Sequence, residues 1–474
     1  MSRRRPLGIV VVAAVALAGL AAADRLDPPA RPAPLAAAEL PGGPTMAPAG
    51  TISAAWYCPG GPLGAADQGD VSVSLANTTA RALEARLTAL PVAGTGDPVE
   101  RLVQVPPLGS ATVRLADVLA GPGAAAGSSG ASSAGASIVS PGGLVAQQSI
   151  KTPEGAAVGP CASAASDRWY TAIGSTAANA TLLLPLLNPF PDDAIVSLSF
   201  LTDQGRAVPG DLQGVVVPGR SVLVVDIGQH VRRRDAVSAE VVARRGRLVV
   251  GRSFRKGAGS STALAAPSPA PTWYLPGGVR AEGATNRLVV ANPSDQDAEV
   301  SVELRLQEGV IEPFTLAVPA QDRAELNLDD ARVPRGVPYA IAVRSLEDVP
   351  VVAERSTEGR AGGRSDVLGS RDPDRAWVAV AAGPRGQDAL AIYNAGEGQA
   401  EVTVTPLDGE GVPLPGGPLR VDAGVRASLR LDDKASTKGS AVLVESNQLL
   451  VVERTSGDGA PTQGGAIAAA LGRR

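Results

Sequence analysis

Histidine, cysteine and aromatic residues are scarce in this chain of 474 residues. It has one histidine, two cysteines and 3% aromatic residues. A zinc site needs three or four nitrogen or sulfur ligands, so these few residues cannot build one. The only histidine, His230, has no Gly-x-Ser-x-Gly motif beside it, which disfavours a serine hydrolase. We therefore expect no catalytic residue, no metal ion and no cofactor.

Excess positive charge is also absent. The formal net charge is −4 at pH 7, and the sequence has no basic stretch with interleaved aromatic residues. Binding to nucleic acid depends on neutralising phosphates with such residues. We therefore expect no nucleic-acid partner.

What the sequence does contain is a repeat. The four tryptophans are separated by 113, 104 and 104 residues, and each is followed 17 to 21 residues later by an asparagine that closes an apolar run. A rare residue at a near-constant period indicates one structural unit used four times. The repeat markers are Trp56, Trp169, Trp273, Trp377, Asn77, Asn188, Asn292 and Asn394.

Each repeat has the pattern of a β-protein. In the stretch 299–306 apolar residues occupy every second position, which is the period of a half-buried strand. About seven such short strands, separated by turn signals, fit into one repeat, as in an Ig-like sandwich. We therefore predict an all-β protein of four tandem Ig-like β-sandwich repeats of about 105 residues. The alternative is a β-propeller, which would need two blades and eight strands per repeat.

The repeat register also predicts the domain limits. The four repeats are expected at 51–166, 167–270, 271–374 and 375–474.

The N-terminus has the pattern of an export signal. Three arginines at 3–5 precede an uninterrupted apolar run at 7–23, which is typical of a signal peptide or a retained signal anchor. Residues 24–50 are rich in alanine and proline and are expected to form a tether. The repeats are thus predicted to be secreted or to lie outside the cell membrane. If the apolar segment 7–23 is not cleaved, the membrane itself is a partner.

The two cysteines lie at the two ends of repeat 1. Cys58 follows Trp56 by two residues, and Cys161 shortly precedes Trp169. Two exported cysteines that bracket one unit favour a disulfide. We predict a bridge between Cys58 and Cys161 that joins the first and last strands of repeat 1.

In each repeat a later alternating strand ends at an aspartate: Asp117, Asp226, Asp329 or Asp432. Catalytic carboxylates must converge in one cleft, whereas these recur once in every unit, so a structural role is expected. In repeats 2 to 4 an arginine follows 22 to 26 residues later. We predict three ion pairs within single repeats: Asp226 with Arg252, Asp329 with Arg355, and Asp432 with Arg454.

The tryptophans admit two interpretations. As buried plugs they would fill a core or a junction between repeats. As exposed rings spaced one repeat apart they would form platforms for sugars. The first is favoured, because the same ring stands on the first strand of every unit.

A resemblance adds to this picture. The motif Trp-Tyr-Cys-Pro-Gly-Gly at 56–61, behind a short N-terminal apolar segment, resembles an actinobacterial family of unknown function, domain-of-unknown-function family 5719. The stretches 287–294 and 351–357 look like tandem extracellular repeats of bacterial surface proteins. Repeat 4 departs from the motif, since Trp377 is followed by Val-Ala. The resemblance implies an exported protein, and it carries no activity or catalytic residue.

The sequence thus predicts a non-enzymatic scaffold or interaction protein of the cell envelope, or of the secreted fraction. The expected partner is an envelope protein or a glycan. The alternative is an array of carbohydrate- or cell-wall-binding modules. An exported hydrolase is a third interpretation, and no catalytic motif in the sequence supports it.

Overall fold

The structure of the chain is a computed structural model. It describes residues 43–62, 70–121, 134–152, 155–309, 311–329, 332–359, 362–380, 388–431, 441–456, 463–467 and 469–470. The segment 1–23 predicted as a signal peptide or anchor lies outside these residues, as does most of the predicted tether. Among the described residues, no helix combines the length and the apolar character that a membrane span requires.

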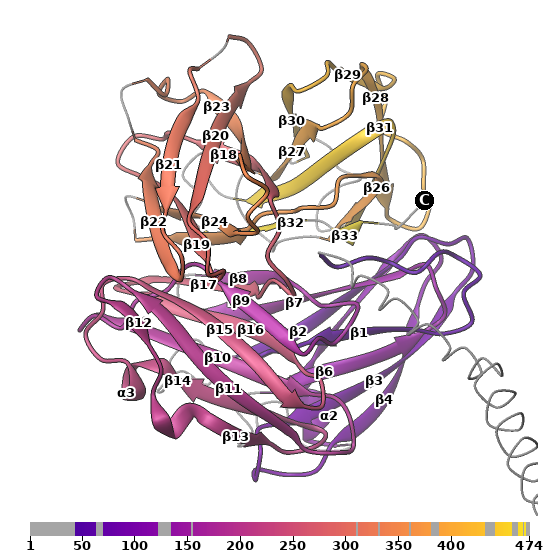
Figure 1. Ribbon diagram of the computed structural model, residues 1–474. Helices are drawn as coiled ribbons and strands as arrows, with labels where there is room; N and C mark the ends of the chain where they lie inside the picture. The colour runs from indigo at the N-terminus through magenta and orange to yellow at the C-terminus, as the bar shows by residue number, and fades with distance from the viewer. Residues whose placement is uncertain are drawn as a thin grey trace, which may run out of the picture. The chain divides into compact units, whose positions relative to one another are not determined.

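The described chain is almost entirely β-structure (Figure 1). Repeat 1 contains β1 (Ala54–Cys58), β2 (Asp70–Asn77), β3 (Leu83–Pro91), β4 (Val99–Val105), β5 (Ser110–Arg114), α2 (Leu115–Leu119), β6 (Ala134–Ser140), β7 (Leu144–Thr152) and β8 (Gly155–Pro160). Repeat 2 contains β9 (Arg168–Thr171), β10 (Ala180–Asn188), β11 (Ala194–Thr202), β12 (Gly205–Ala207), η1 (Gly210–Leu212), β13 (Gln213–Val217), β14 (Ser221–Asp226), α3 (Ile227–His230), β15 (Val237–Arg245), β16 (Val249–Lys256) and β17 (Gly259–Leu264).

The other two repeats follow the same plan. Repeat 3 contains β18 (Thr272–Val279), β19 (Thr285–Asn292), β20 (Ala298–Leu306), β21 (Phe314–Val318), β22 (Asp322–Asn327), β23 (Pro338–Ser345), β24 (Val352–Glu358) and β25 (Arg364–Leu368). Repeat 4 contains β26 (Asp374–Ala379), β27 (Asp388–Asn394), β28 (Ala400–Leu407), β29 (Leu419–Val421), β30 (Arg426–Arg430), β31 (Ala441–Ser456), β32 (Gln463–Ile467) and β33 (Ala469–Ala470).

In repeat 4 the long strand β31 belongs to both sheets, and β32 pairs in parallel with β25, so that one sheet of repeat 3 continues into repeat 4. Apart from that junction the strands are antiparallel, and each repeat is a sandwich of two sheets. We call them the Trp sheet and the Asn sheet after the marker that each holds. In repeat 1 the Trp sheet has the order β1-β6-β3-β4 and the Asn sheet the order β5-β2-β7-β8. Most successive strands therefore cross from one sheet to the other, as in Ig-like sandwiches, and only β3-β4 and β7-β8 are neighbours within one sheet. In a propeller blade all strands follow one another within one sheet. The predicted fold class is confirmed.

The strand count differs from the sequence prediction. Within the described residues, repeats 1, 3 and 4 have eight strands each and repeat 2 has nine, where seven were expected. The missed strand is the one that follows and pairs with the third strand of the Asn sheet: β8, β17, β25 or β32. It is short and rich in small or polar residues. It lacks the alternation of a half-buried strand because neighbouring repeats cover it.

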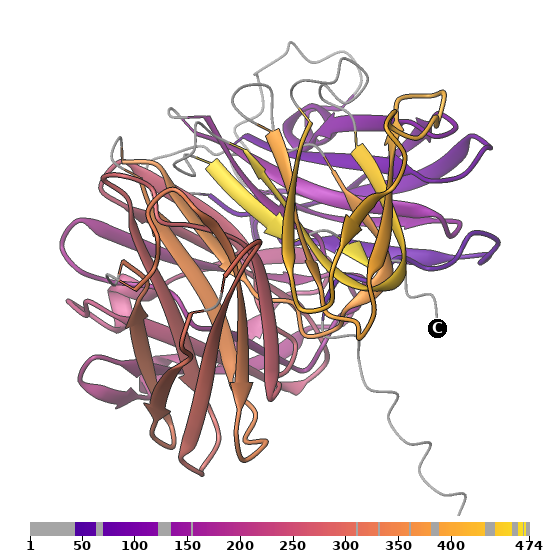
Figure 2. The ribbon, with the colours of Figure 1, turned by 90° about the horizontal axis from the view of Figure 1, so that it is seen from above.

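The last strands bring the four repeats together. Strand β8 contacts β17, β17 contacts β25, β25 contacts β32, and β32 contacts β8. Small residues permit this approach: a side chain at Gly259 would lie 2.5 Å from the carbonyl oxygen of Gly362. The four repeats thus form a closed cycle, with repeats 3 and 4 in front of repeats 1 and 2 when seen from above (Figure 2).

The four tryptophans are buried and join the two sheets of each sandwich. The exposed fraction of each ring is 1% or less. Each indole N–H donates to a backbone carbonyl of the Asn sheet, or of the residue directly before its third strand, at 2.7–2.9 Å; the acceptors are Leu144, Leu248, Val351 and Leu450. A buried indole needs such a partner. The rings act as core plugs and offer no platform to a ligand.

The four marker asparagines make the same three hydrogen bonds in every repeat. In repeat 3 the fully buried Asn292 donates through Nδ2 to the carbonyls of Gln296 and Val318, at 2.7 and 3.0 Å, and accepts the backbone N–H of Ser294 at 3.1 Å. The same pattern occurs around Asn77, Asn188 and Asn394. The asparagine closes its own turn and ties it to the Trp sheet.

Repeat 1 has a covalent tie as well. Cys58 and Cys161 form a disulfide, as predicted. The bridge spans 103 residues of sequence, and by the chain-entropy argument a loop of that length stabilises the fold by about 4–5 kcal/mol.

Residues 43–50 differ from the predicted tether, because they pack on repeat 1. Met46 is 4% exposed and belongs to the apolar core of that repeat. The backbone N–H of Thr45 donates to Ser163 Oγ at 3.0 Å. Burial of an apolar side chain in a core that has room for it lowers the free energy of the folded state. Repeat 1 therefore begins before residue 51.

Replacing the asparagine of repeat 3 tests its structural role. Asn292→Ala leaves the buried carbonyl of Val318 and the partly buried carbonyl of Gln296 without their donor, so we expect the free energy of unfolding to fall by about 2 kcal/mol. Chemical denaturation of the full chain measures this loss. Asn327→Ala, at an exposed asparagine of the same repeat, is the control, and equal losses in both variants would contradict the assigned role.

Candidate functional site

The four repeats share one buried position on the third strand of the Asn sheet, and in repeats 2 to 4 this position holds an arginine. Arg355 lies opposite Leu288, and Arg454 lies opposite Leu390. Both leucines precede the marker asparagine of their repeat by four residues. Arg252 occupies the same place in repeat 2, where the next residue, Ser253, lies opposite Leu183. In repeat 1 the place belongs to Gln148, opposite Val73.

The predicted pair of Asp226 with Arg252 is wrong. Leu183 pairs with Asp226 on one neighbouring strand and with Ser253 on the other. Residues paired in this way point to the same face of the sheet, so Asp226 and Ser253 share one face. Because successive side chains of a strand point to opposite faces, Arg252 points away from Asp226. Asp226 instead caps helix α3 by accepting the backbone N–H of Gly228 at 3.0 Å.

The predicted pair of Asp329 with Arg355 is wrong as well. Asp329 accepts hydrogen bonds from the backbone and the side-chain amide of Asn286, at 2.9 and 3.1 Å. Asp432 lies outside the described residues, so its pairing with Arg454 stays a prediction. Arg454 itself binds Asp388 of the same repeat through Nε and Nη2, at 2.8 and 2.5 Å.

The arginine of repeat 2 binds a carboxylate of repeat 3. Arg252 donates through Nη1 to Glu354, and both side chains are 0% exposed. The same carboxylate accepts the backbone N–H groups of Ala172 and Ile173, at 3.1 and 3.2 Å. These two residues follow the tryptophan strand of repeat 2. We call this arrangement, in which one repeat clamps the buried glutamate of the next, a carboxylate latch.

A second carboxylate latch joins repeats 3 and 4. Arg355 donates through Nη2 and Nη1 to the two carboxylate oxygens of Glu453, at 2.6 and 3.3 Å. The backbone N–H of Gly277 donates to the same carboxylate at 2.9 Å. Arg426 lies close by, and burial is the main reason why its pKa falls to about 10.

The junction of repeats 1 and 2 has no latch. Gly251 stands where repeats 3 and 4 have glutamate, and a side chain there would lie 2.8 Å from Pro59 of repeat 1. On the other side, Gln148 replaces the arginine and accepts the backbone N–H of Gly60 within its own repeat at 2.8 Å. The arginine and the glutamate are thus missing together, and apolar packing takes their place.

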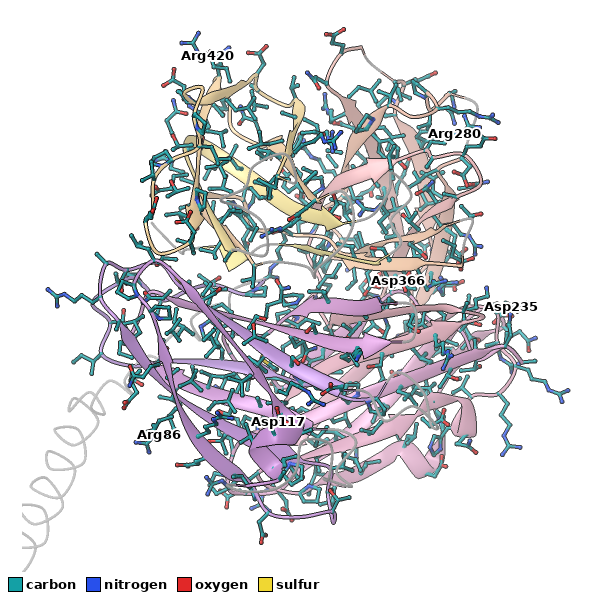
Figure 3. The ribbon with its side chains drawn as sticks, turned by 180° about the vertical axis from the view of Figure 1, so that it is seen from behind. Arg86, Asp117, Asp235, Arg280, Asp366 and Arg420 are labelled. Carbon is teal, nitrogen blue, oxygen red and sulfur yellow. A yellow bond between two sulfur atoms is a disulfide. The ribbon has the colours of Figure 1, made fainter. Side chains whose placement is uncertain are left out.

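A second buried charge lies between repeats 2 and 3. Asp366 accepts hydrogen bonds from Arg364, at 2.7 Å, and from Ser261 of repeat 2. Burial alone raises the pKa of Asp366, but the charges of Arg364 and Arg252 and these hydrogen bonds hold it below its usual value. Asp366 lies in the interior of the four-repeat structure, whereas Arg86 and Arg420 extend from its surface (Figure 3).

A pocket with a volume of about 150 Å³ lies at the same junction. Its floor is the outer face of the Trp sheet of repeat 2, with Tyr170, Glu240 and Ser199 in one row across three strands. Its wall comes from repeat 3 and includes Ala291 and Gln321. Glu240 accepts a hydrogen bond from the Ser199 hydroxyl at 3.1 Å.

The single histidine takes part in neither latch nor pocket. His230 ends helix α3, and its Nδ1 lies 2.6 Å from Asp211 Oδ2.

The two glutamates on which the latches depend, Glu354 and Glu453, are not among the residues predicted from the sequence. Their signal is the pair Glu-Arg at 354–355 and 453–454, against Gly-Arg at 251–252. Neighbouring residues on a strand face opposite ways, so a glutamate and an arginine that are both buried there must find partners in two different repeats.

Comparison with known proteins gives a family and no activity. The family of unknown function DUF5719 matches residues 123–432. No curated protein matches the sequence.

Two solved structures illustrate how distant the similar folds are. The crystal structure of Thermotoga maritima 1070 is 22% identical and covers 21% of this chain and 93% of its own, with a TM-score of 0.20. The crystal structure of a tetra-tandem repeat in the extending region of a large adhesion protein is 13% identical. It covers 85% of this chain and 96% of its own, with a TM-score of 0.13. Scores this low carry no argument about function.

Glu354→Gln tests the first latch. The change leaves the buried charge of Arg252 without a counter-charge, so we expect the free energy of unfolding to fall by about 3–5 kcal/mol. The double variant with Arg252→Met should recover most of the loss, since no unpaired charge of the latch then stays buried. Denaturant unfolding of the four members of this double-mutant cycle gives the coupling energy.

The exposed pair of Arg86 and Glu100 serves as a control for the latch. Its side chains are 62% and 51% exposed, and solvent screens such pairs. Glu100→Gln should change stability far less than Glu354→Gln. Additive effects of Glu354→Gln and Arg252→Met would contradict the latch.

The lowered pKa of Asp366 predicts a dependence of stability on pH. A carboxyl group that binds its proton less tightly in the folded state stabilises that state above its unfolded pKa, and the contribution is lost as pH falls through the folded pKa. The free energy of unfolding should therefore fall steeply below about pH 4. Asp366→Asn should flatten this part of the curve, whereas Asp97→Asn, at an exposed site, should not. Identical slopes in both variants would refute the role of Asp366.

Proposed function

We propose that this chain, which belongs to the family of unknown function DUF5719, is a non-enzymatic scaffold of the cell envelope or of the secreted fraction. The observation that carries the proposal is the use of its buried charges. Glu354 and Glu453, both 0% exposed, are held by groups of the preceding repeat. In an enzyme such carboxylates would border a cleft and meet substrate. Here they hold one repeat to the next.

The markers of the repeat support the same function. The tryptophan rings, with exposed fractions of 1% or less, are unable to act as a row of sugar platforms. The buried asparagines bind backbone groups of their own repeat. The most distinctive residues of the sequence therefore maintain the architecture, as expected of a scaffold.

The disulfide supports export. Cytoplasmic thiols are kept reduced, and disulfides persist in secreted and surface proteins. The bridge between Cys58 and Cys161 agrees with the basic and apolar N-terminal pattern, from which we propose either a signal peptide or a membrane anchor. Under this proposal the repeats lie outside the cytoplasm, and their partner is an envelope protein or a glycan.

Fractionation of the producing cells tests the proposed location. We expect the full chain in the membrane, wall or medium fraction, with its two cysteines oxidised. Alkylation of free thiols before a non-reducing gel distinguishes the two redox states, and the chain with both Cys58→Ala and Cys161→Ala marks the mobility without a bridge. A cytoplasmic chain with free thiols would refute export, and turnover of envelope polysaccharide or peptide by the purified chain would refute the non-enzymatic role.

A further inference from the structure

The residue after each tryptophan faces the next repeat. The tryptophan fills the core of its own sandwich, so its neighbour on the strand points outward. At the junction of repeats 1 and 2, the ring of Tyr57 lies 6.5 Å from that of Phe190. At the junction of repeats 3 and 4, Tyr274 is stacked on Tyr393, with 5.5 Å between ring centroids and 29° between the planes. At both junctions the next repeat supplies an aromatic partner.

At the junction of repeats 2 and 3 the corresponding tyrosine, Tyr170, has no aromatic ring against it among the described residues. The place of Tyr393 is taken there by Ala291. Both residues directly precede the marker asparagine. Tyr393 lies between Arg426 and Val451 in the sheet, and Ala291 lies between Arg323 and Val352. An alanine therefore stands where the neighbouring junction has a stacked ring.

The pocket of about 150 Å³ lies in the space that the missing ring leaves, because Tyr170, Ala291 and Val352 all line it. A cavity of about this volume, engineered into another protein, holds one benzene molecule. The pocket therefore has room for one six-membered ring beside Tyr170, and larger substituents on that ring must extend out of the pocket toward the exposed Arg206.

Most of the other lining residues are polar, although Leu201, Ala239 and Pro293 also border the pocket. Glu240 and Ser199 stand in the same row as Tyr170, and Gln321 lies on the wall. Arg206 reaches the pocket from the edge strand β12, and its exposed guanidinium has no hydrogen-bond or ion-pair partner within the described part of the chain. A carboxylate, a hydroxyl, an amide and a guanidinium around one ring-sized space suit a ring that carries hydroxyl groups in several directions.

We propose that this pocket binds one hexopyranose ring, stacked on Tyr170, whose hydroxyl groups are bound by Glu240, Arg206 and Gln321. A sugar ring presents apolar C–H groups on its face and hydroxyls on its edge, which matches an aromatic floor with polar sides. Glu240 keeps its contacts with Ser199 and Arg168 whatever enters the pocket, but a planar hydrocarbon ring would give no hydrogen bond to Arg206, which has no partner within the described part of the chain. The sugar is either a free monosaccharide or the terminal residue of an envelope glycan.

Saturation-transfer NMR on the full chain tests the proposal. The probes are the methyl glycosides of glucose, galactose, mannose and N-acetylglucosamine, fragments of envelope polysaccharide, and phenol as a planar ring without sugar hydroxyls. We expect transfer to the ring protons of at least one glycoside or polysaccharide fragment. Transfer to the glycosides identifies a monosaccharide site, and transfer to the fragments alone identifies the end of a glycan.

Two variants and one control make the test specific. Ala291→Tyr fills the pocket as Tyr393 fills the neighbouring junction, so the fold should tolerate it while affinity falls by about tenfold or more. Glu240→Gln should weaken binding without filling the pocket. Leu102→Tyr adds the same ring at an exposed site of repeat 1 and should leave binding unchanged. Binding of phenol alone, binding that survives Ala291→Tyr, or no binding of any probe would overturn the proposal.

Discussion

A buried carboxylate must be matched by positive charge and by hydrogen-bond donors, and this requirement holds the repeats of the chain together. Glu354 would be costly inside repeat 3 by itself, because burial of an unpaired charge costs several kcal/mol. Its matching groups are Arg252 and two backbone amides, and all of them belong to repeat 2. The fold of one repeat is therefore completed only by its neighbour.

The latches also give the chain a direction. On the third strand of the Asn sheet, a glutamate and an arginine stand side by side and face opposite ways. In repeat 3 the glutamate binds backward to repeat 2, and the arginine binds forward to Glu453 of repeat 4. Repeat 1 has no such arginine and repeat 2 no such glutamate, so the junction between them loses both charges together. A single one of these charges would have been left buried and unpaired.

The repeat and its strands could be predicted from the sequence because their signals are local. The tryptophan period and the alternation of apolar residues need no knowledge of partners. The ion pairs could not be predicted in this way. Asp226 and Arg252 belong to one repeat and one sheet, yet a shift of one residue along a strand moves a side chain to the other face.

The candidate site is even less local. The pocket exists because position 291 holds alanine where position 393 holds tyrosine, and the sequence shows this difference only after the two repeats are aligned on their asparagines. Glu240 and Tyr170 are far apart in sequence and meet through strand pairing. The last strands were missed for a related reason, since neighbouring repeats cover them and remove their alternation.

The meeting of strands β8, β17, β25 and β32 has a consequence for how such a chain can evolve. A solenoid grows or shrinks by whole units, since each unit touches only its neighbours. Here the fourth unit returns to the first, so duplication or loss of one unit by recombination would leave the circle without closure. We therefore expect the number of units to stay fixed, while the residues at each junction are free to differ.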